Sequence, residues 1–252
     1  MLKNRIIPIL LLKHGRCVKG KRFTDYRDTG APITAARIYD AQRVDELVFL
    51  DILASREERD VLLNIVTETA QECFMPLTVG GGVKTIEDIK VLLSAGADKV
   101  SINTAAIEEP AFLEAAAGYF GRANIVAAVD YKLNDQGKRE VFSHGGTKAT
   151  GKDPFEWAKE VARLGAGELI VTSIDQEGTM TGYDLEFIKL VSEALSIPVI
   201  AHGGVGTLKD LKEGITIGRA SGVAAASIFH FTDQSPIKAR LYLKDNGVNV
   251  RI

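Results

Sequence analysis

Short apolar runs alternate with longer amphipathic stretches along the whole chain, and this alternation constrains the fold more than any other feature. The runs typical of strands lie at residues 5–12, 46–52, 77–79, 99–102, 125–130, 169–172, 199–201 and 222–226. Helical periodicity lies between them, including residues 31–42, 56–72, 86–94, 154–164, 185–194 and 208–213. Strands that are apolar on both faces, each followed by a helix, indicate a parallel sheet. Eight such units predict an α/β protein with a closed (β/α)8 TIM barrel.

The two halves of the chain resemble each other. Residues 5–13 line up with 124–132, 49–52 loosely with 172–175, 80–83 with 202–205, and 99–103 with 225–229. Four correspondences in the same order predict a barrel built from two similar half-barrels. No low-complexity linker or shift in composition divides the 252 residues, so we expect residues 1–252 to form a single domain.

Charge and cysteine content narrow the classes of partner and site. The net charge of −2 gives no general basic field for nucleic acid or a membrane surface. Cys17 and Cys73 lack metal-ligand spacing, and a reduced pair is favoured over one disulfide. The apolar run at 6–12 has no cleavage site after it, so it predicts a buried strand and a cytoplasmic protein. The four histidines show no metal-type pairing, and neither a metal nor a cofactor is predicted.

Glycine pairs follow the third and seventh predicted strands, where backbone N–H groups can approach a ligand closely. Barrels often bind phosphate with the loops after strands 7 and 8. The residues predicted to bind phosphate are Gly203, Gly204, Ala226 and Ser227 in one half and Gly81, Gly82, Asn103 and Thr104 in the other. The alternative is that the glycines only form tight turns. Two sites across one barrel mouth imply an elongated, doubly phosphorylated ligand.

Asp130 ends the fifth strand, and its partner in the repeat is Leu11 at the end of the first. Strand alternation predicts that both side chains point into the mouth of the barrel. Chemistry that gives one proton and removes another usually needs two titratable groups, and a leucine cannot be one of them. Asp130 is therefore either a catalytic group without its partner or a carboxylate that satisfies backbone N–H groups.

Charged residues begin four of the strands: Arg5, Glu46, Lys99 and Glu168. Two positive and two negative side chains at the N-terminal rim predict a closed salt-bridge ring. Taken alone, the ring is better interpreted as a plug that stabilises the barrel than as a gate for a small molecule.

Two further residues lie near the predicted ligand. Lys19 lies in a long segment after the first strand, residues 13–30, which is long enough to act as a lid. Without other evidence, the interpretation as a solvated loop lysine is favoured over a role in ligand binding. His202 ends the seventh strand beside Gly203 and is the one histidine predicted to face the ligand.

The chain resembles the cyclase subunit of imidazole glycerol phosphate synthase, the HisF family, over essentially its whole length. The most specific stretches are residues 45–52, 78–82, 97–105, 172–175, 178–179 and 227–231. The resemblance implies a glutaminase subunit, HisH-like, docked at the N-terminal face, and ammonia that crosses the barrel to a phosphorylated substrate. It also implies that the ammonia gate consists of Arg5, Glu46, Lys99 and Glu168, and that Asp98 lies near the partner interface. At the other end of the barrel it implies that Asp130 is catalytic, that Lys19 belongs to the ligand loop, and that Gly178 is a further phosphate-binding residue.

The departures from the family pattern are local. HisF proteins carry Asp-Val-Lys-Asp-Gly where this chain has Leu-Leu-Lys-His-Gly at residues 11–15, and a small serine where it has His202. The run at residues 6–13 is similar to the divergent WbuZ branch, which implies sugar amidation with an N-acetyl sugar amidotransferase in surface-polysaccharide biosynthesis. The leading hypothesis is an ammonia-conducting barrel of that kind. The alternatives are an authentic histidine-pathway cyclase–lyase and a phosphate-binding barrel without catalysis.

Overall fold

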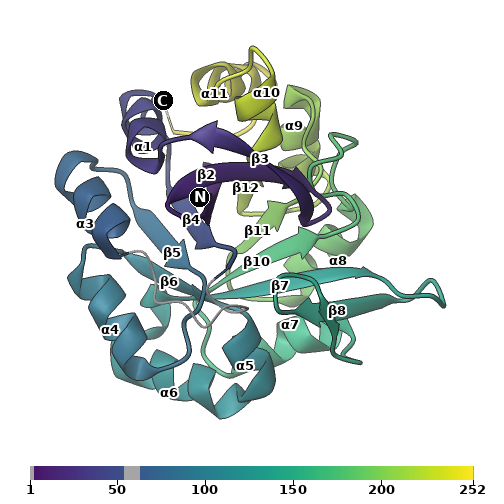
Figure 1. The fold of residues 1–252 in the computed structure, drawn as a ribbon. Coiled ribbons are helices and arrows are strands. Elements are labelled where there is room, and N and C mark those ends of the chain that lie inside the picture. Colours follow the sequence, from purple (N-terminus) through teal and green to yellow (C-terminus); the bar gives the residue numbers. More distant parts are fainter. Residues whose placement is uncertain (1–2, 54–62, 252) are drawn as a thin grey trace.

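The computed structural model describes residues 3–53 and 63–251, and within them eight parallel strands close into a barrel (Figure 1). In chain order these are β1 (Arg5–Lys13), β4 (Leu47–Asp51), β5 (Leu77–Gly80), β6 (Lys99–Ile102), β7 (Ile125–Leu133), β10 (Glu168–Ser173), β11 (Val199–His202) and β12 (Gly222–Ala225). Parallel pairing of β12 with β1 and of β7 with β10 closes the circle. The predicted (β/α)8 barrel is confirmed.

Helices surround the barrel, and most match the predicted segments. They are α1 (Pro32–Ala41), α3 (Leu63–Glu72), α4 (Ile86–Ser94), α5 (Thr104–Glu108), α6 (Pro110–Phe120), α7 (Pro154–Arg163), α8 (Leu185–Ala194), α9 (Leu208–Thr216), α10 (Ser227–Phe231) and α11 (Pro236–Asp245), with a 3₁₀ turn at Arg122–Asn124. The first part of the helix predicted at 56–72 lies outside the described residues. Helices α5, α6, α10 and α11 lie outside the predicted segments, and the alanine-rich α6 has only a weak polar face.

The internal repeat reappears in matching helix caps. Helix α4 follows β5, and α9 follows β11, the corresponding strand of the other half. Thr85 caps α4 by accepting the N–H of Asp88, whose carboxylate accepts the N–H of Thr85. Thr207 and Asp210 form the same reciprocal box on α9. Two helices in equivalent places thus begin by the same local device, as expected for two similar half-barrels.

Strand alternation divides the buried side chains between the barrel interior and two clusters outside it, the smaller of which includes Ile6, Ala201 and Val223. Leu10, Leu12 and Phe49 lie in the larger core with residues of the surrounding helices. The opposite set fills the barrel interior and comprises Ile7, Ile9, Leu11, Val48, Val126, Ile170, Ile200 and Ala224, joined by Val18 from the hairpin above. A period of two along β1 explains why Ile7, Ile9 and Leu11 share one face. The barrel is therefore filled by apolar side chains between its two ends.

The long segment after β1 is a two-stranded hairpin rather than an irregular loop. Strand β2 (Arg16–Lys21) pairs with β1 and with β3 (Thr24–Gly30), both antiparallel. Figure 1 shows the hairpin arching over one end of the barrel. A second extension, β8 (Arg139–Ser143) with the short β9 (Lys148–Ala149), continues from β7 and projects beyond the helices. Both extensions grow from the carboxyl ends of barrel strands and so wall the same mouth.

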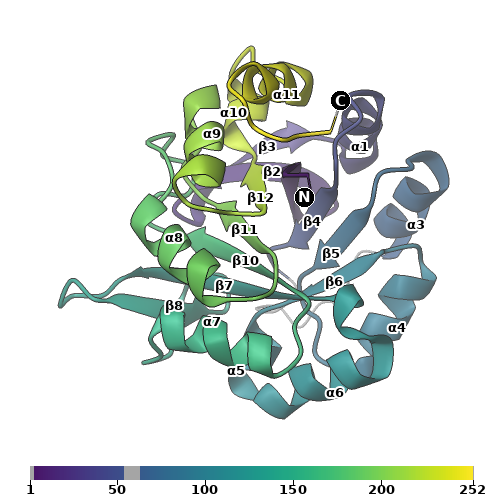
Figure 2. The ribbon, with the colours of Figure 1, turned by 180° about the vertical axis from the view of Figure 1, so that it is seen from behind.

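The opposite end of the barrel carries both ends of the described chain. Seen from behind in Figure 2, the first strand begins beside the C-terminal tail. A parallel bridge joins Asn4 to Val250, and the Asn4 N–H donates to Asn249 O at 2.8 Å. Cys17 and Cys73 are buried and free. Among the described residues no helix is both long and apolar enough to cross a membrane.

Candidate functional site

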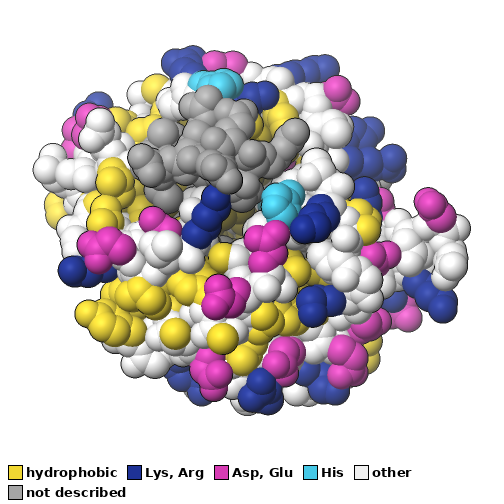
Figure 3. Space-filling view, turned by 60° about the horizontal axis from the view of Figure 1, so that its bottom comes forward, with side chains coloured by type: hydrophobic (Ala, Val, Ile, Leu, Met, Phe, Trp, Pro, Cys, Tyr) yellow, Lys and Arg dark blue, Asp and Glu magenta, His cyan; other side chains and the backbone are white. Residues whose placement is uncertain are grey.

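A cavity of about 400 Å³ opens at the carboxyl ends of the strands, beneath the β2–β3 hairpin. Of the predicted site residues, the structure brings Leu11, Gly81, Gly82, Asn103, Thr104, Asp130 and His202 together in its wall. In the space-filling view, acidic, basic and histidine side chains are mixed on the visible surface, with no broad field of one sign among the described residues of this face (Figure 3). We call this space the mouth cavity.

Asp130 lies in the mouth cavity, held by side chains rather than by backbone N–H groups. Its Oδ2 accepts the amide of Asn103 at 2.7 Å, and the hydroxyl of Thr172 hydrogen-bonds to the same carboxyl group. Burial raises the pKa of Asp130 to about 6, and the two hydrogen bonds oppose that shift only in part. The carboxyl group can therefore gain or lose a proton near neutral pH. This behaviour is not expected of a carboxylate that only satisfies backbone N–H groups, the alternative interpretation from the sequence.

Leu11 faces the same cavity but contributes only apolar surface. It is 6% exposed and packs in the interior cluster with neighbours such as Val48 and Ile170. Leu50, Phe23 and Tyr26 extend this apolar wall under the hairpin. The prediction that Leu11 and Asp130 point into one mouth is confirmed. At position 11 the wall of the cavity is apolar and carries no group that could exchange a proton.

The first glycine pair lines the mouth cavity with Asn103 and Thr104. Gly81 and Gly82 both have positive φ, and a Cβ on Gly81 would lie 2.2 Å from the carbonyl oxygen of Asp51. The glycines are therefore required by the tight turn itself, whatever they bind. The hydroxyl of Thr104 accepts the N–H of His144 at 3.1 Å, which ties the β8 extension to this side of the cavity.

The second glycine pair lines a separate, much smaller space that we call the niche. Its wall includes Gly178, Gly203, Gly204, Ala226 and Ser227, the predicted phosphate residues of the other half. A Cβ on Gly178 would lie 2.3 Å from Gly20 O, so this glycine lets the hairpin pack closely.

Lys19 and Glu177 fill the niche with an ion pair. Lys19 is 2% exposed, which contradicts its interpretation as a solvated loop lysine. Burial lowers its pKa to about 7. The second oxygen of Glu177, Oε2, is buried without a hydrogen-bond partner among the described residues. Sequence reasoning missed Glu177, because nothing in its spacing marks it. The predicted phosphate residues of this half therefore surround an ion pair.

His202 stands in the wall between the two spaces and lines both of them. It is 5% exposed, and its Nδ1 lies 3.2 Å from the hydroxyl of Thr172. Burial, together with the nearby Lys19, lowers the pKa of His202 to about 3, so the ring is neutral at physiological pH. The prediction that His202 faces the ligand region agrees with this position.

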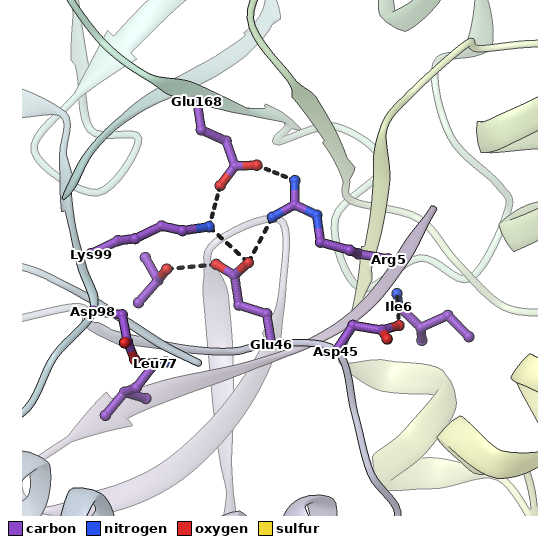
Figure 4. A network of polar contacts seen from close by, with 9 residues as sticks. Arg5, Ile6, Asp45, Glu46, Leu77, Asp98, Lys99 and Glu168 are labelled. Atoms are coloured by element: carbon purple, nitrogen blue, oxygen red, sulfur yellow. Dashed lines mark hydrogen bonds and ion pairs between the residues drawn. The ribbon is translucent and has the colours of Figure 1, made fainter. Parts of the chain in front are cut away.

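The predicted ring closes at the opposite end of the barrel (Figure 4). Arg5 donates to Glu46 at 2.7 Å and to Glu168, while Lys99 lies 2.9 Å from Glu46 and 2.7 Å from Glu168. Each cation thus contacts both carboxylates. Thr78, which sequence reasoning missed, donates to the remaining oxygen of Glu46 at 2.6 Å. The carboxylates are buried and the cations about one-fifth exposed, so the ring separates solvent at this rim from the apolar interior.

Asp98 lies outside the ring on the same rim. Its carboxylate accepts the N–H of Leu77 at 2.8 Å, where β5 begins. The equivalent contact in the first strand is Asp45, which accepts the N–H of Ile6 at 2.9 Å. Within the described part of the chain, no group of three or more His, Cys, Asp or Glu side chains is placed to hold a metal ion.

The comparison with known protein families agrees with this architecture. The family model for the histidine biosynthesis proteins matches residues 5–235, from the first barrel strand to the residue before α11. The match includes the ring, both glycine pairs and Asp130. The chain belongs to the histidine biosynthesis protein family.

Proposed function

We propose that this protein is the barrel subunit of a glutamine-dependent complex, which receives ammonia at the rim that carries the ring and conducts it to the mouth cavity. Members of the family are generally isomerases or cyclases. The observation that carries the proposal is the arrangement along one axis: a closed ring of Arg5, Glu46, Lys99 and Glu168, an apolar interior, and a cavity with a titratable carboxyl group.

The apolar interior favours neutral ammonia over ammonium. Moving an unpaired cation from water to an apolar surface costs at least several kcal/mol of free energy, whereas the transfer of a small neutral molecule such as ammonia costs far less. The ring supports selection of ammonia over ammonium at the entrance. Its two cations repel ammonium, and its two carboxylates are already paired with those cations. An uncharged molecule passes when one of the Lys99 contacts opens, because that side chain is flexible and unbranched.

Exposed apolar side chains at the rim support docking of a glutaminase there. Phe74 is 89% exposed in the turn before β5, and Tyr119 is 69% exposed near the end of α6. Each residue lies where the chain returns to the amino end of a barrel strand, β5 after Phe74 and β7 after Tyr119, which places both on the side of the ring. Large aromatic side chains left in water are typical of protein interfaces.

The docking part of the proposal is tested by two matched variants. Phe74→Ala should weaken binding of a HisH-like glutaminase at least tenfold in a titration, while thermal unfolding of the free barrel stays unchanged. Leu133→Ala is the control, because Leu133 is also more than half exposed but lies at the far end of β7, beside the mouth. Equal loss of affinity in both variants, or none in Phe74→Ala, contradicts docking at this rim.

The conduction part is tested by coupling. In the complex, Lys99→Met should lower the nitrogen delivered to the acceptor per glutamine hydrolysed several-fold, because the ring no longer admits ammonia selectively. The control Lys90→Met changes an exposed lysine on α4. If the nitrogen delivered per glutamine hydrolysed is unchanged in Lys99→Met, the proposed conduction through the ring is contradicted.

The acceptor we propose is an N-acetyl sugar of surface-polysaccharide biosynthesis, through an N-acetyl sugar amidotransferase. The leucine at position 11 supports it, because half of the expected acid–base pair is missing. Reconstitution with the glutaminase and the amidotransferase should raise glutamine-dependent amidation above that of the amidotransferase alone. No increase argues for the second candidate.

The second candidate is an authentic cyclase–lyase of histidine biosynthesis, which the elevated pKa of Asp130 in the mouth cavity favours. Turnover of the cyclase substrate with free ammonia, near that of an authentic enzyme, would establish it. Leu11→Asp should then give little gain, because a working enzyme must already hold its second acid or base elsewhere.

A further inference from the structure

Three polar side chains stand in one row across neighbouring barrel strands. Asp130 on β7 is in register with Thr172 on β10, and Thr172 is in register with His202 on β11. Parallel strands in register present such residues on the same face, and all three line the mouth cavity. Oγ1 of Thr172 lies 3.2 Å from His202 Nδ1, and hydrogen bonding by the same side chain lowers the pKa of its register partner Asp130.

From this row we infer that Asp130, Thr172 and His202 form a proton relay that joins the niche to the mouth cavity. His202 is then the second proton-transferring group that position 11 does not supply. It acts on Asp130 through Thr172 and is a positioning residue. The inference does not depend on ammonia conduction or on the identity of a partner.

The direction of the relay follows from the single hydroxyl proton of Thr172. When Asp130 is a carboxylate, Thr172 donates to it, so His202 must donate its Nδ1–H to the threonine oxygen. When Asp130 is protonated, its O–H donates to that oxygen, and Thr172 donates instead to an unprotonated Nδ1. His202 then carries its proton on Nε2. The two protonation states of Asp130 therefore select opposite neutral tautomers of His202.

The transfer balances without a co-reactant. One proton from the niche binds Nε2 of His202, the Nδ1 proton passes to Thr172, and the hydroxyl proton of Thr172 passes to the Asp130 carboxylate. One N–H bond and two O–H bonds form, while one N–H and one O–H bond break, and the net gain is the one proton taken up. The reverse sequence delivers a proton from Asp130 to the niche.

The surroundings favour neutral histidine in both states. Burial and Lys19 lower the pKa of His202, so imidazolium does not accumulate. Asn103 donates to Oδ2 of Asp130, and the hydroxyl of Thr172 bonds to the same carboxyl group. Among the described residues, the charged and titratable groups that line the two spaces or lie beside them are Lys19, Glu177 and His230 around His202, and Tyr26, Asp51, Lys84, Glu108 and His144 around the mouth cavity.

The test is ¹⁵N NMR of the histidine rings in the isolated full-length protein, titrated from pH 4.5 to 8, with His202 assigned by its loss in His202→Gln. We expect the Nδ1–H tautomer above about pH 6 and the Nε2–H tautomer below it, following the pKa of Asp130. No imidazolium signal should develop for His202. A single tautomer throughout, or an imidazolium signal, overturns the relay.

Three variants separate a relay from simple packing. Thr172→Val keeps the shape but removes the hydroxyl, and the tautomer change should vanish. Thr172→Ser restores the hydroxyl and should restore the change, while Asp130→Asn should fix one tautomer at every pH. A change that persists in Thr172→Val contradicts the relay. These experiments contain no glutaminase and no acceptor. A negative result therefore contradicts the relay alone and has no bearing on the coupling experiments that test the proposed function.

Discussion

At the scale of single residues, Asp130 is the side chain whose environment most alters its chemistry. Folding raises its pKa from 3.8 to about 6, so the folded state binds more protons than the unfolded state between these values. Stability is therefore lost as pH rises through this window, and the ionised carboxylate is destabilising above about pH 6.

Asp130→Asn should therefore stabilise the protein at pH 8 by about 1–3 kcal/mol, the order of magnitude that a shift of this size implies. The gain should disappear near pH 4, where the native carboxyl group is protonated. Urea unfolding at the two pH values measures both quantities. Asp135→Asn, which changes an exposed aspartate in the turn between β7 and β8, is the control and should show no such difference.

At the scale of secondary-structure elements, the reciprocal caps fix where two equivalent helices begin. Thr85→Ala and Thr207→Ala each remove a side-chain acceptor for a helix N–H and should each lower the free energy of unfolding by about 1 kcal/mol. The effects should add, since the two caps lie in different halves.

Chemical unfolding of the single and double variants measures the additivity. Thr85→Ser and Thr207→Ser keep the accepting oxygen and serve as controls, with losses of a few tenths of a kcal/mol at most. If the serine variants lose as much as the alanine variants, the caps do not stabilise the helices by their hydrogen bonds.

At the scale of the whole molecule, the ring joins strands from both halves, because Glu168 begins β10 in the second half while Arg5, Glu46 and Lys99 belong to the first. Burial raises the pKa of Glu168, but Arg5 and Lys99 outweigh burial and hold it below 4.5. This contribution to stability is present above pH 4.5 and is lost as the pH falls through the lower pKa of the folded state.

Glu168→Gln should consequently unfold more easily at pH 7, by about 3 kcal/mol, since it leaves two cations facing one carboxylate. Its stability should fall less steeply than that of the wild type between pH 5 and pH 3. Urea midpoints across that range measure the slope, with exposed Glu156→Gln on α7 as control. Parallel slopes for Glu168→Gln and wild type would contradict a paired Glu168.

The fold was predictable from local signals because periodicity is a local property. Runs such as residues 5–12 are apolar at every position, and this pattern predicts a strand covered on both faces. The ring was predictable for the same reason, since four charged residues each begin a strand. Phe74 and Thr78 were missed because exposure and a contact with Glu46 depend on neighbours that are distant in the sequence.

The mouth was predicted only in part. Alternation along each strand correctly placed Leu11 and Asp130 on the inner face. It could not give the register between strands, on which the row of Asp130, Thr172 and His202 depends. Nor could it give the path of residues 13–30, whose hairpin brings Lys19 to Glu177 across 158 positions of sequence.

The sequence by itself determined the eightfold strand–helix order, the two similar halves, the charges at the strand starts and the leucine at position 11. These are properties of spacing and residue type. Only the tertiary structure decided which polar side chains line one cavity, where the hairpin places Lys19, and which carboxyl group has its pKa raised. The reason is physical: burial, register and hydrogen bonding arise between segments far apart in the chain, and they come into existence only when the barrel closes.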